Sequence, residues 1–157
     1  MGTAASPAEQ LAAGSFRLAI AAARYNEAIV AGLLEGAYAA WKEHGGTASA
    51  LQIEHVPGAF ELPLAARALA LQRGIDGVIA LGCVIRGDTA HFEYVAGQCA
   101  AGLQRVMLDT GVPVSFGVLT VESLPQAQQR SAPGAGNKGR EALETALAMA
   151  SLLRRLK

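Results

Sequence analysis

Residues 77–85 have the sequence GVIALGCVI, a run without a single charged side chain. Such a run is too uniformly apolar for a strand with one face in water, and it is typical of a strand that helices cover on both sides. Polar and glycine residues follow directly, beginning with Arg86 and Gly87, so the strand should end there. This stretch predicts a parallel sheet buried between layers of helices.

Strand-like and helix-like segments alternate on both sides of this run. Further strands are expected at residues 17–23, 48–56 and 113–120. Helices are expected from Asn26, a plausible N-cap, to the stop at His44-Gly45-Gly46, and at residues 59–71, 90–109, 124–130 and 137–156. This alternation predicts one α/β layer sandwich with right-handed crossovers. We expect a flexible arm over residues 1–14 and a single domain over residues 15–157.

Composition limits the kinds of partner. The chain has 157 residues, of which 52% are apolar and only 17% charged, so a monomer would have difficulty covering its surface with polar groups. We therefore expect an oligomer that hides part of that surface. Lysine and arginine together number 13, as do aspartate and glutamate, and no basic run precedes the short C-terminal tail. Neither nucleic acid nor an anionic membrane is an expected partner.

The two cysteines, Cys83 and Cys99, lie in apolar stretches without metal-like spacing. We interpret them as buried free thiols of a reducing cytoplasm, and no metal site is expected. No apolar run approaches the length of a membrane span, and no secretory signal is apparent. Residues 1–6, MGTAAS, fit the loose myristoylation pattern, which we interpret as a chance match. A cytoplasmic protein is expected.

Polar or glycine-rich clusters follow each predicted strand, where parallel sheets bind ligands. They are residues 24–26, 57–61, 85–91 and the segment after Thr120. In the third cluster, backbone N–H groups at a helix start and the Thr89 hydroxyl could hold an anion, and His91 could move protons. Alternatively, Arg86 is a structural ion-pair partner and His91 a capping residue. These residues alone indicate a small anionic ligand and acid–base chemistry.

Residues 134–139, GAGNKG, match the G-x-G-x-x-G dinucleotide pattern in form only. They follow a helix-like segment rather than a strand, and the chain ends before an acidic residue could meet a ribose. Lys138 is followed by Gly139, so the segment is not a Walker loop either. It is interpreted as a tight loop before the last helix. Lys138 and Arg130 are then either ligand-binding cations or solvated loop charges.

The clusters, in this order, resemble the lumazine synthase family over nearly the whole chain from Phe16 onward. The resemblance rests on four motifs: PGAFELP at 57–63, GCVIRGDTAHFEYV at 82–95, FGVLT at 116–120 and AGNKG at 135–139. It implies a three-layer αβα sandwich of flavodoxin-like type, with a four-stranded parallel sheet in the order 2-1-3-4. It also implies condensation of 5-amino-6-ribitylaminouracil with 3,4-dihydroxy-2-butanone 4-phosphate, without cofactor or metal. Phosphate and water leave in this reaction.

The resemblance also implies a role for each site residue. Tyr25 would lie against the pyrimidine, Ala59, Phe60 and Glu61 would hold the ribityl chain, and Val84 and Ile85 would bind the pyrimidine through their backbone. Gly87, Asp88 and Thr89 would cradle the phosphate, and His91 would transfer protons. A neighbouring subunit would supply Phe116, Arg130 and Lys138, with Arg130 on the phosphate and Lys138 beside the pyrimidine carbonyl.

A shared site of this kind implies a homopentamer or an assembly of pentamers, and free pentamer, decamer and sixty-subunit shell stay open. Two residues depart from the family pattern: Tyr25 replaces the usual Phe or Trp, and Ala90 stands where some members carry a hydroxyl. The loop near Gly134 also lacks a lysine that is common there. A flavin or lumazine storage protein is the alternative function. A receiver-type module is disfavoured because the strand ends lack an acidic cluster.

Overall fold

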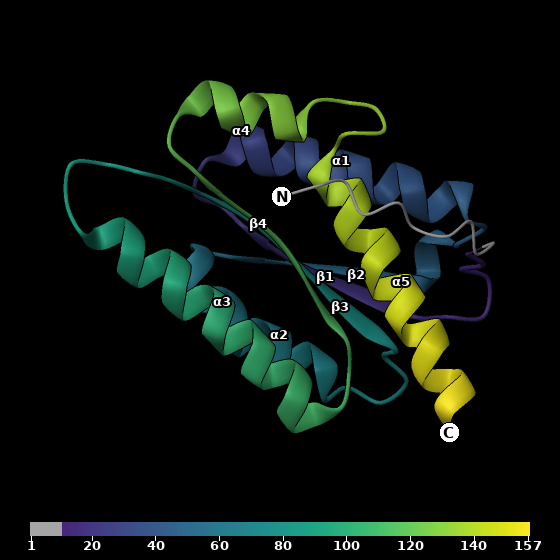
Figure 1. Cartoon of the computed structure of the whole chain (residues 1–157). Helices are drawn as coiled ribbons and strands as arrows, with labels where there is room; N and C mark the ends of the chain where they lie inside the picture. The colour runs from purple at the N-terminus through teal and green to yellow at the C-terminus, as the bar shows by residue number, and fades with distance from the viewer. Residues whose placement is uncertain (1–10) are drawn as a thin grey trace.

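Four parallel strands form one sheet between two layers of helices (Figure 1). The computed structural model describes residues 11–157. The strands are β1 (Leu18–Ala23), β2 (Leu51–Val56), β3 (Gly77–Ile85) and β4 (Val114–Val121). Their order in the sheet is β2-β1-β3-β4, with β1 pairing to both β2 and β3. The predicted parallel sheet and its order 2-1-3-4 are confirmed.

The helices divide between the two faces of the sheet. One face is covered by α1 (Glu27–Glu43), α4 (Leu124–Ser131) and α5 (Lys138–Leu156), and the other by α2 (Leu62–Ala70) and α3 (His91–Thr110) (Figure 1). Each layer encloses its own cluster of buried apolar side chains, which meet the sheet from opposite sides. The predicted three-layer αβα sandwich is confirmed.

The two central strands explain why the apolar runs are unbroken. Every residue of β1 is buried, and so are residues 77–83 of β3. Only Val84 and Ile85, the last two residues of β3, are partly exposed. Because side chains alternate between the two faces of a strand, full burial requires a helical layer on each side. In the two central strands, residues are therefore accessible to solvent only at the carboxyl end of β3.

Three local details differ from the sequence prediction. Residues 48–50 form a 3₁₀ turn before β2, and residues 59–61 form another before α2. Asn26 does precede α1, but its side chain does not cap the helix as predicted. Its backbone is left-handed, with φ 57°, and its Nδ2 donates to the carbonyl oxygen of Cys83 at 2.8 Å. Asn26 is the N-cap residue, as predicted, but the predicted side-chain bond is absent, because the left-handed backbone and the bond to Cys83 direct the side chain toward β3.

Helices α1 and α5 cross at very close range. A Cβ atom at Gly139 would lie 1.8 Å from the carbonyl oxygen of Leu33, so only glycine fits there. Asn137, which is 1% exposed, caps α5 by accepting hydrogen bonds from the backbone N–H groups of Gly139 and Arg140. Its amide nitrogen donates to carbonyl oxygens of Gly32, Ser131 and Ala132. One buried amide therefore joins α1, the end of α4 and the start of α5.

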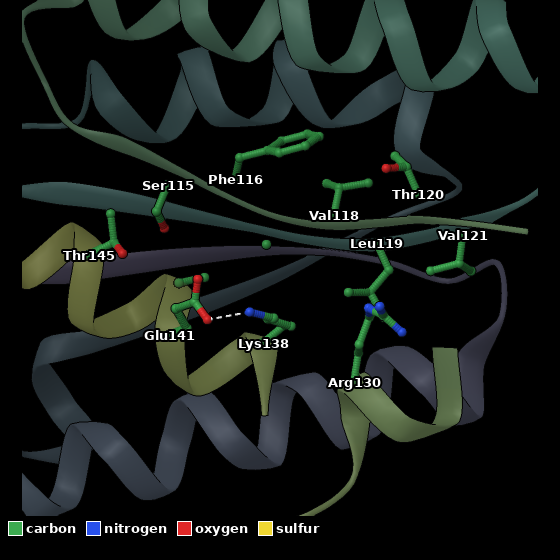
Figure 2. Close-up of a pocket in the computed structure, with 12 residues that line it drawn as sticks. Ser115, Phe116, Val118, Leu119, Thr120, Val121, Arg130, Lys138, Glu141 and Thr145 are labelled. Carbon is green, nitrogen blue, oxygen red and sulfur yellow. Dashed lines mark hydrogen bonds and ion pairs between the residues drawn. The ribbon is translucent and has the colours of Figure 1, made fainter. Parts of the chain in front are cut away.

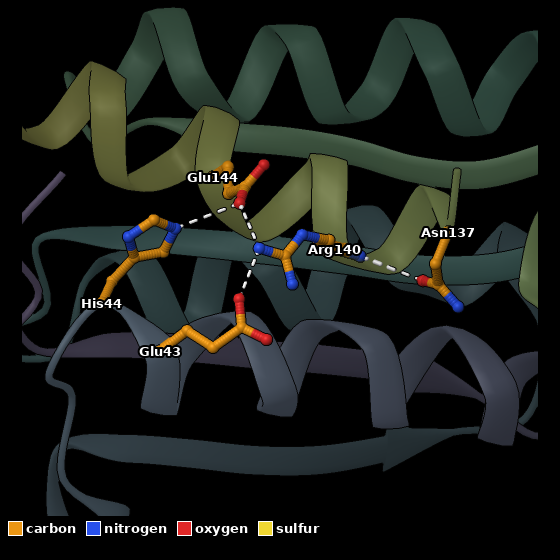
Figure 3. A network of polar contacts seen from close by, with 5 residues as sticks. All are labelled: Glu43, His44, Asn137, Arg140 and Glu144. Atoms are coloured by element: carbon orange, nitrogen blue, oxygen red, sulfur yellow. Dashed lines mark hydrogen bonds and ion pairs between the residues drawn. The ribbon is translucent and has the colours of Figure 1, made fainter. Parts of the chain in front are cut away.

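A polar network closes the same helix pair at the C-terminal end of α1 (Figure 3). Arg140 of α5 donates to Glu43 of α1 at 2.5 Å and lies 3.3 Å from Glu144. His44, which ends α1, contacts Glu144 at 3.0 Å. The bond from the Arg140 guanidinium lowers the pKa of the Glu43 carboxyl below its ordinary value of 4.5. Glu43 is therefore ionised at neutral pH.

The start of the described chain packs against the domain. Ala13 is buried, and its N–H donates to the carbonyl oxygen of His44 at 2.8 Å. Residues 1–10, which include the myristoylation pattern and most of the arm expected over residues 1–14, lie outside the described residues.

Candidate active site

A cavity of about 560 Å³ opens where β1 and β3 end. Residues from four separate segments line it: Tyr25 and Asn26, Gly58 to Glu61, Cys83 to Ile85, and His91, Tyr94 and Val95. Three of the four predicted clusters therefore meet at one cavity. Of the predicted site residues, it gathers Tyr25, Ala59, Phe60, Glu61, Val84, Ile85 and His91.

Backbone hydrogen bonds fix the segments around this cavity. The N–H of Arg24 donates to Val56 at 2.9 Å and that of Tyr25 to Pro57 at 3.2 Å, so the ladder between β1 and β2 continues past both strands. A Cβ atom at Gly58 would lie 3.0 Å from the Tyr25 ring and 3.2 Å from a Glu61 carboxylate oxygen. Glycine at this position therefore lets the ring and the carboxylate approach the same turn.

Three aromatic rings border the cavity and are exposed to solvent. The exposed fractions are 73% for Tyr25, 58% for Phe60 and 69% for Tyr94. Large exposed rings around a concavity provide flat apolar surfaces for a planar ligand. Tyr94 was not among the predicted site residues. Its position three residues after His91 on α3 was the available signal, because that spacing places both side chains on one face of the helix.

The phosphate segment predicted at residues 87–89 lies beside this cavity but is not part of its lining. The Thr89 hydroxyl accepts a hydrogen bond from the backbone N–H of His91 at 3.3 Å. Gly87 and Asp88 are exposed, and a Cβ atom at Gly87 would meet nothing within 4 Å. His91 is the first residue of α3, so the segment stands at the positive end of a helix dipole.

Cys83 borders the cavity without being a nucleophile. The side chain is buried, and burial raises its pKa to about 11, as it does for Cys99. A thiol with such a pKa is protonated near neutral pH and unreactive. Both cysteines are free and buried, as the sequence predicted.

The remaining predicted residues line a second cavity of about 460 Å³ along the edge strand β4. Phe116 lies on β4 with its ring directed away from Arg130 and Lys138, which extend toward the other side of the strand from α4 and α5 (Figure 2). Arg130 donates to the carbonyl oxygen of Gln126 at 3.0 Å, and Lys138 pairs with Glu141 at 2.6 Å. Phe116 is 48% exposed although the rest of its strand is largely buried.

The two cavities share no lining residue. One chain therefore brings together His91 and the aromatic rings in the first cavity, and Phe116, Arg130 and Lys138 in the second. As predicted, residues 134–139 follow a helix, α4, rather than a strand, and they lead into α5, which begins at Lys138.

Residues 11–157 contain neither a metal-binding cluster nor a membrane-spanning helix. No three side chains among His, Cys, Asp and Glu in this range lie together in a way that could hold a metal ion. No helix within these residues has the length and apolar character needed to cross a membrane.

Comparison with known proteins identifies the family. The family model described as 6,7-dimethyl-8-ribityllumazine synthase matches residues 15–154. The chain belongs to this family. Proteins named 6,7-dimethyl-8-ribityllumazine synthase from two strains of Thermus thermophilus are each 52% identical to it over 143 residues, which is 91% of this chain and 91% of the relative.

Family membership agrees with the resemblance drawn from the four motifs. The matched range contains both cavities and all predicted site residues. Neither the comparisons nor the geometry favours the storage protein that the sequence left open.

Proposed function

We propose that the chain condenses 5-amino-6-ribitylaminouracil with 3,4-dihydroxy-2-butanone 4-phosphate to give 6,7-dimethyl-8-ribityllumazine, at sites that two subunits complete. The observation that carries the proposal is the division of the family's site residues between two separate cavities of one chain. A neighbour's β4 edge placed against the first cavity would add its Phe116, Arg130 and Lys138. A homopentamer, alone or packed with further pentamers, repeats this contact around a closed ring.

In the first cavity, the rings of Tyr25 and Phe60 suit the flat pyrimidine, and the Glu61 carboxylate can accept hydrogen bonds from ribityl hydroxyls. Val84 and Ile85 are partly exposed at the end of β3, where their backbone groups would bind the uracil edge. Tyr25 retains the stacking surface of the family's usual Phe or Trp. Its exposure leaves that surface available to a ligand.

The phosphorylated substrate would lie over residues 87–89, with its phosphate facing the start of α3. Backbone N–H groups and the helix dipole favour an anion there, and the neighbour's Arg130 would add a planar cation. Among residues 11–157, the Arg130 guanidinium donates one hydrogen bond, to Gln126, so further N–H donors are left for the phosphate. His91, between this segment and the pyrimidine cavity, would transfer protons during imine formation and phosphate elimination.

We further propose that the protein works in the cytoplasm without cofactor, metal, nucleic acid or membrane. Cys83 and Cys99 remain free thiols in such a reducing compartment.

Mixing purified protein with both substrates and following lumazine absorbance tests the reaction. His91→Ala should lower kcat about a hundredfold, and Arg130→Ala should raise the KM of the phosphorylated substrate at least about tenfold. Two matched controls, His55→Ala at the end of β2 and Arg105→Ala on α3, should leave both constants unchanged. Absence of product above the uncatalysed rate would remove the proposed function.

Co-assembly tests the shared site. A ring that mixes His91→Ala and Arg130→Ala chains contains some sites with an intact first cavity and an intact second one. Activity should therefore reappear on mixing, although each variant alone is weak. If mixing under conditions that exchange subunits restores nothing, each chain works alone and the two-subunit site is wrong.

A further inference from the structure

Arg86 holds two carboxylates at once, directly beside the proposed phosphate segment. Its Nε donates to Glu122 at 2.8 Å, and its Nη1 donates to Glu93. The guanidinium also lies 4.3 Å from the centre of the Phe92 ring. The bond from Arg86 lowers the pKa of Glu93, so both members of that pair are charged at neutral pH. A guanidinium so paired is not a free cation for phosphate.

Each of the two carboxylates adjoins a different half of the site: Glu93 lies between His91 and Tyr94 of the first cavity, and Glu122 follows Val121 of the second. Glu93 lies in the first turn of α3, two residues after His91. Glu122 follows β4 and directly precedes Ser123, the N-cap of α4. The backbone N–H of Arg86 also donates to the carbonyl oxygen of Val121 at 2.9 Å. Arg86 thus ties the start of α3 to the start of α4.

From Glu122 the contacts continue to Arg130. The backbone N–H of Glu122 donates to the Gln126 side-chain oxygen at 2.8 Å. The main-chain carbonyl oxygen of Gln126 accepts a hydrogen bond from the Arg130 guanidinium at 3.0 Å. An unbroken series of polar contacts therefore runs from the turn that carries His91 to the cation that lines the second cavity.

Stability alone does not account for such a residue. The side chains of Arg86, Glu93 and Glu122 are 38%, 54% and 62% exposed, and exposed ion pairs contribute little to folding. Geometry is what an arginine adds, because its planar fork donates in two fixed directions, whereas a lysine is a point charge.

We propose that Arg86 is a positioning residue that fixes the two half-sites of one chain relative to each other. Through Glu93 it holds the turn with His91, and through Glu122 and Gln126 it orients the Arg130 that a neighbour would use. The inference rests on the proposed function, because only a shared site gives one chain two halves to align. A ligand that shifts the first cavity of a chain would then also shift the Arg130 that this chain contributes to its neighbour's site.

Kinetics of Arg86→Gln and Arg86→Lys test the positioning role, with Arg105→Gln as the matched control. Arg105 pairs with Asp109 on α3 at 3.3 Å, away from both cavities. Both Arg86 variants should keep the control's Tm and lose about tenfold in kcat/KM. Full rescue by Arg86→Lys would overturn the proposal, because charge alone would then suffice. So would wild-type kinetics in Arg86→Gln.

Mixed assemblies show which half is affected. Two tester variants separate the halves: His91→Ala chains need a partner with an intact first cavity, and Arg130→Ala chains need a partner with an intact second cavity. Arg86→Gln chains should restore less activity to both testers than Arg105→Gln chains do. Gln126→Ala removes the side-chain oxygen that accepts from the Glu122 N–H and leaves the main-chain bond to Arg130, so it breaks the series between Glu122 and α4. It should fail with Arg130→Ala alone. Full restoration of the Arg130→Ala tester by Arg86→Gln would confine Arg86 to its own cavity and overturn the coupling. If Arg105→Gln chains restore neither tester, the two-subunit site is wrong, and if wild-type protein forms no product, the proposed function is wrong.

Discussion

At the scale of single residues, Gly87 separates folding from ligand binding. A methyl group there would meet no atom of the chain within 4 Å, yet it would stand beside the N–H groups proposed to bind phosphate. Gly87→Ala should therefore keep the wild-type Tm while raising the KM of the phosphorylated substrate about tenfold. Thermal melts and steady-state kinetics on one preparation check both parts. An equal KM would place the phosphate elsewhere.

Single residues are also where sequence and structure diverge. Asn26 was expected to cap α1 and instead bonds to β3, because a backbone carbonyl of Cys83 lies within reach of its amide. Local sequence cannot predict that contact, since the two residues are 57 positions apart. Whether Arg86 is a structural ion-pair partner could not be decided from the sequence for the same reason. Glu122, which binds it, is 36 residues away along the chain.

At the scale of elements, the crossing of α1 and α5 depends on Gly139. A Cβ atom there would overlap the Leu33 carbonyl, so Gly139→Ala forces the helices apart and should lower the Tm by roughly 5–10 °C. Gly97→Ala on α3 is the matched control, because nothing lies within 4 Å of the added carbon. Alanine also favours helix over glycine, so that variant should melt at or slightly above the wild-type temperature. Equal melting of both variants would mean that the helices do not cross this closely.

The same helix pair should respond to acid through Glu43. Its folded pKa is lowered by Arg140, so the pair stabilises the fold above the ordinary pKa of 4.5 and loses that effect as pH falls through the lowered folded value. Glu43→Gln should therefore reduce the Tm slightly at pH 7, with a difference that shrinks in more acidic buffer. Melts across that range, with Glu35→Gln on the same helix as control, measure it. A difference that is constant with pH would contradict the linkage.

The elements themselves were largely predictable. The run at 77–85 predicted β3 with its observed bounds, and the positions Ile29, Leu33, Ala37 and Trp41 of α1 are all buried. An unbroken apolar run marks a strand that is buried on both faces, and apolar residues at helical spacing mark a helix that is buried on one. Neither pattern identifies residues 48–50 and 59–61, which form short 3₁₀ turns.

At the scale of the whole molecule, assembly should determine activity. If each site needs a neighbour's Arg130 and Lys138, dissociated chains lack half of it. Specific activity should fall in step with the fraction of dissociated chains as the protein is diluted or treated with mild denaturant. Native mass spectrometry should show a multiple of five subunits in the active sample. Full activity in a sample of monomers would exclude a shared site.

At the scale of the whole molecule, the arrangement of the site residues is the feature least predictable from the residues alone. The clusters at 24–26, 57–61 and 85–91 follow strands that end at one edge of a parallel sheet, so their meeting could be predicted. That Arg130 and Lys138 line a different cavity depends on how α4 and α5 fold over β4. The separation became predictable only through the resemblance to a family.

The open edge of β4 has a consequence for making the protein. Within the described residues β4 pairs only with β3, so its outer edge carries unpaired peptide groups beside the exposed ring of Phe116. Such an edge accepts any extended peptide, including the same strand of an unfinished chain. In newly synthesised chains, correct partnering therefore competes with aggregation. Slow expression at low temperature should favour the soluble product, and Thr120→Lys, which adds a charge to the exposed edge, should reduce inclusion bodies.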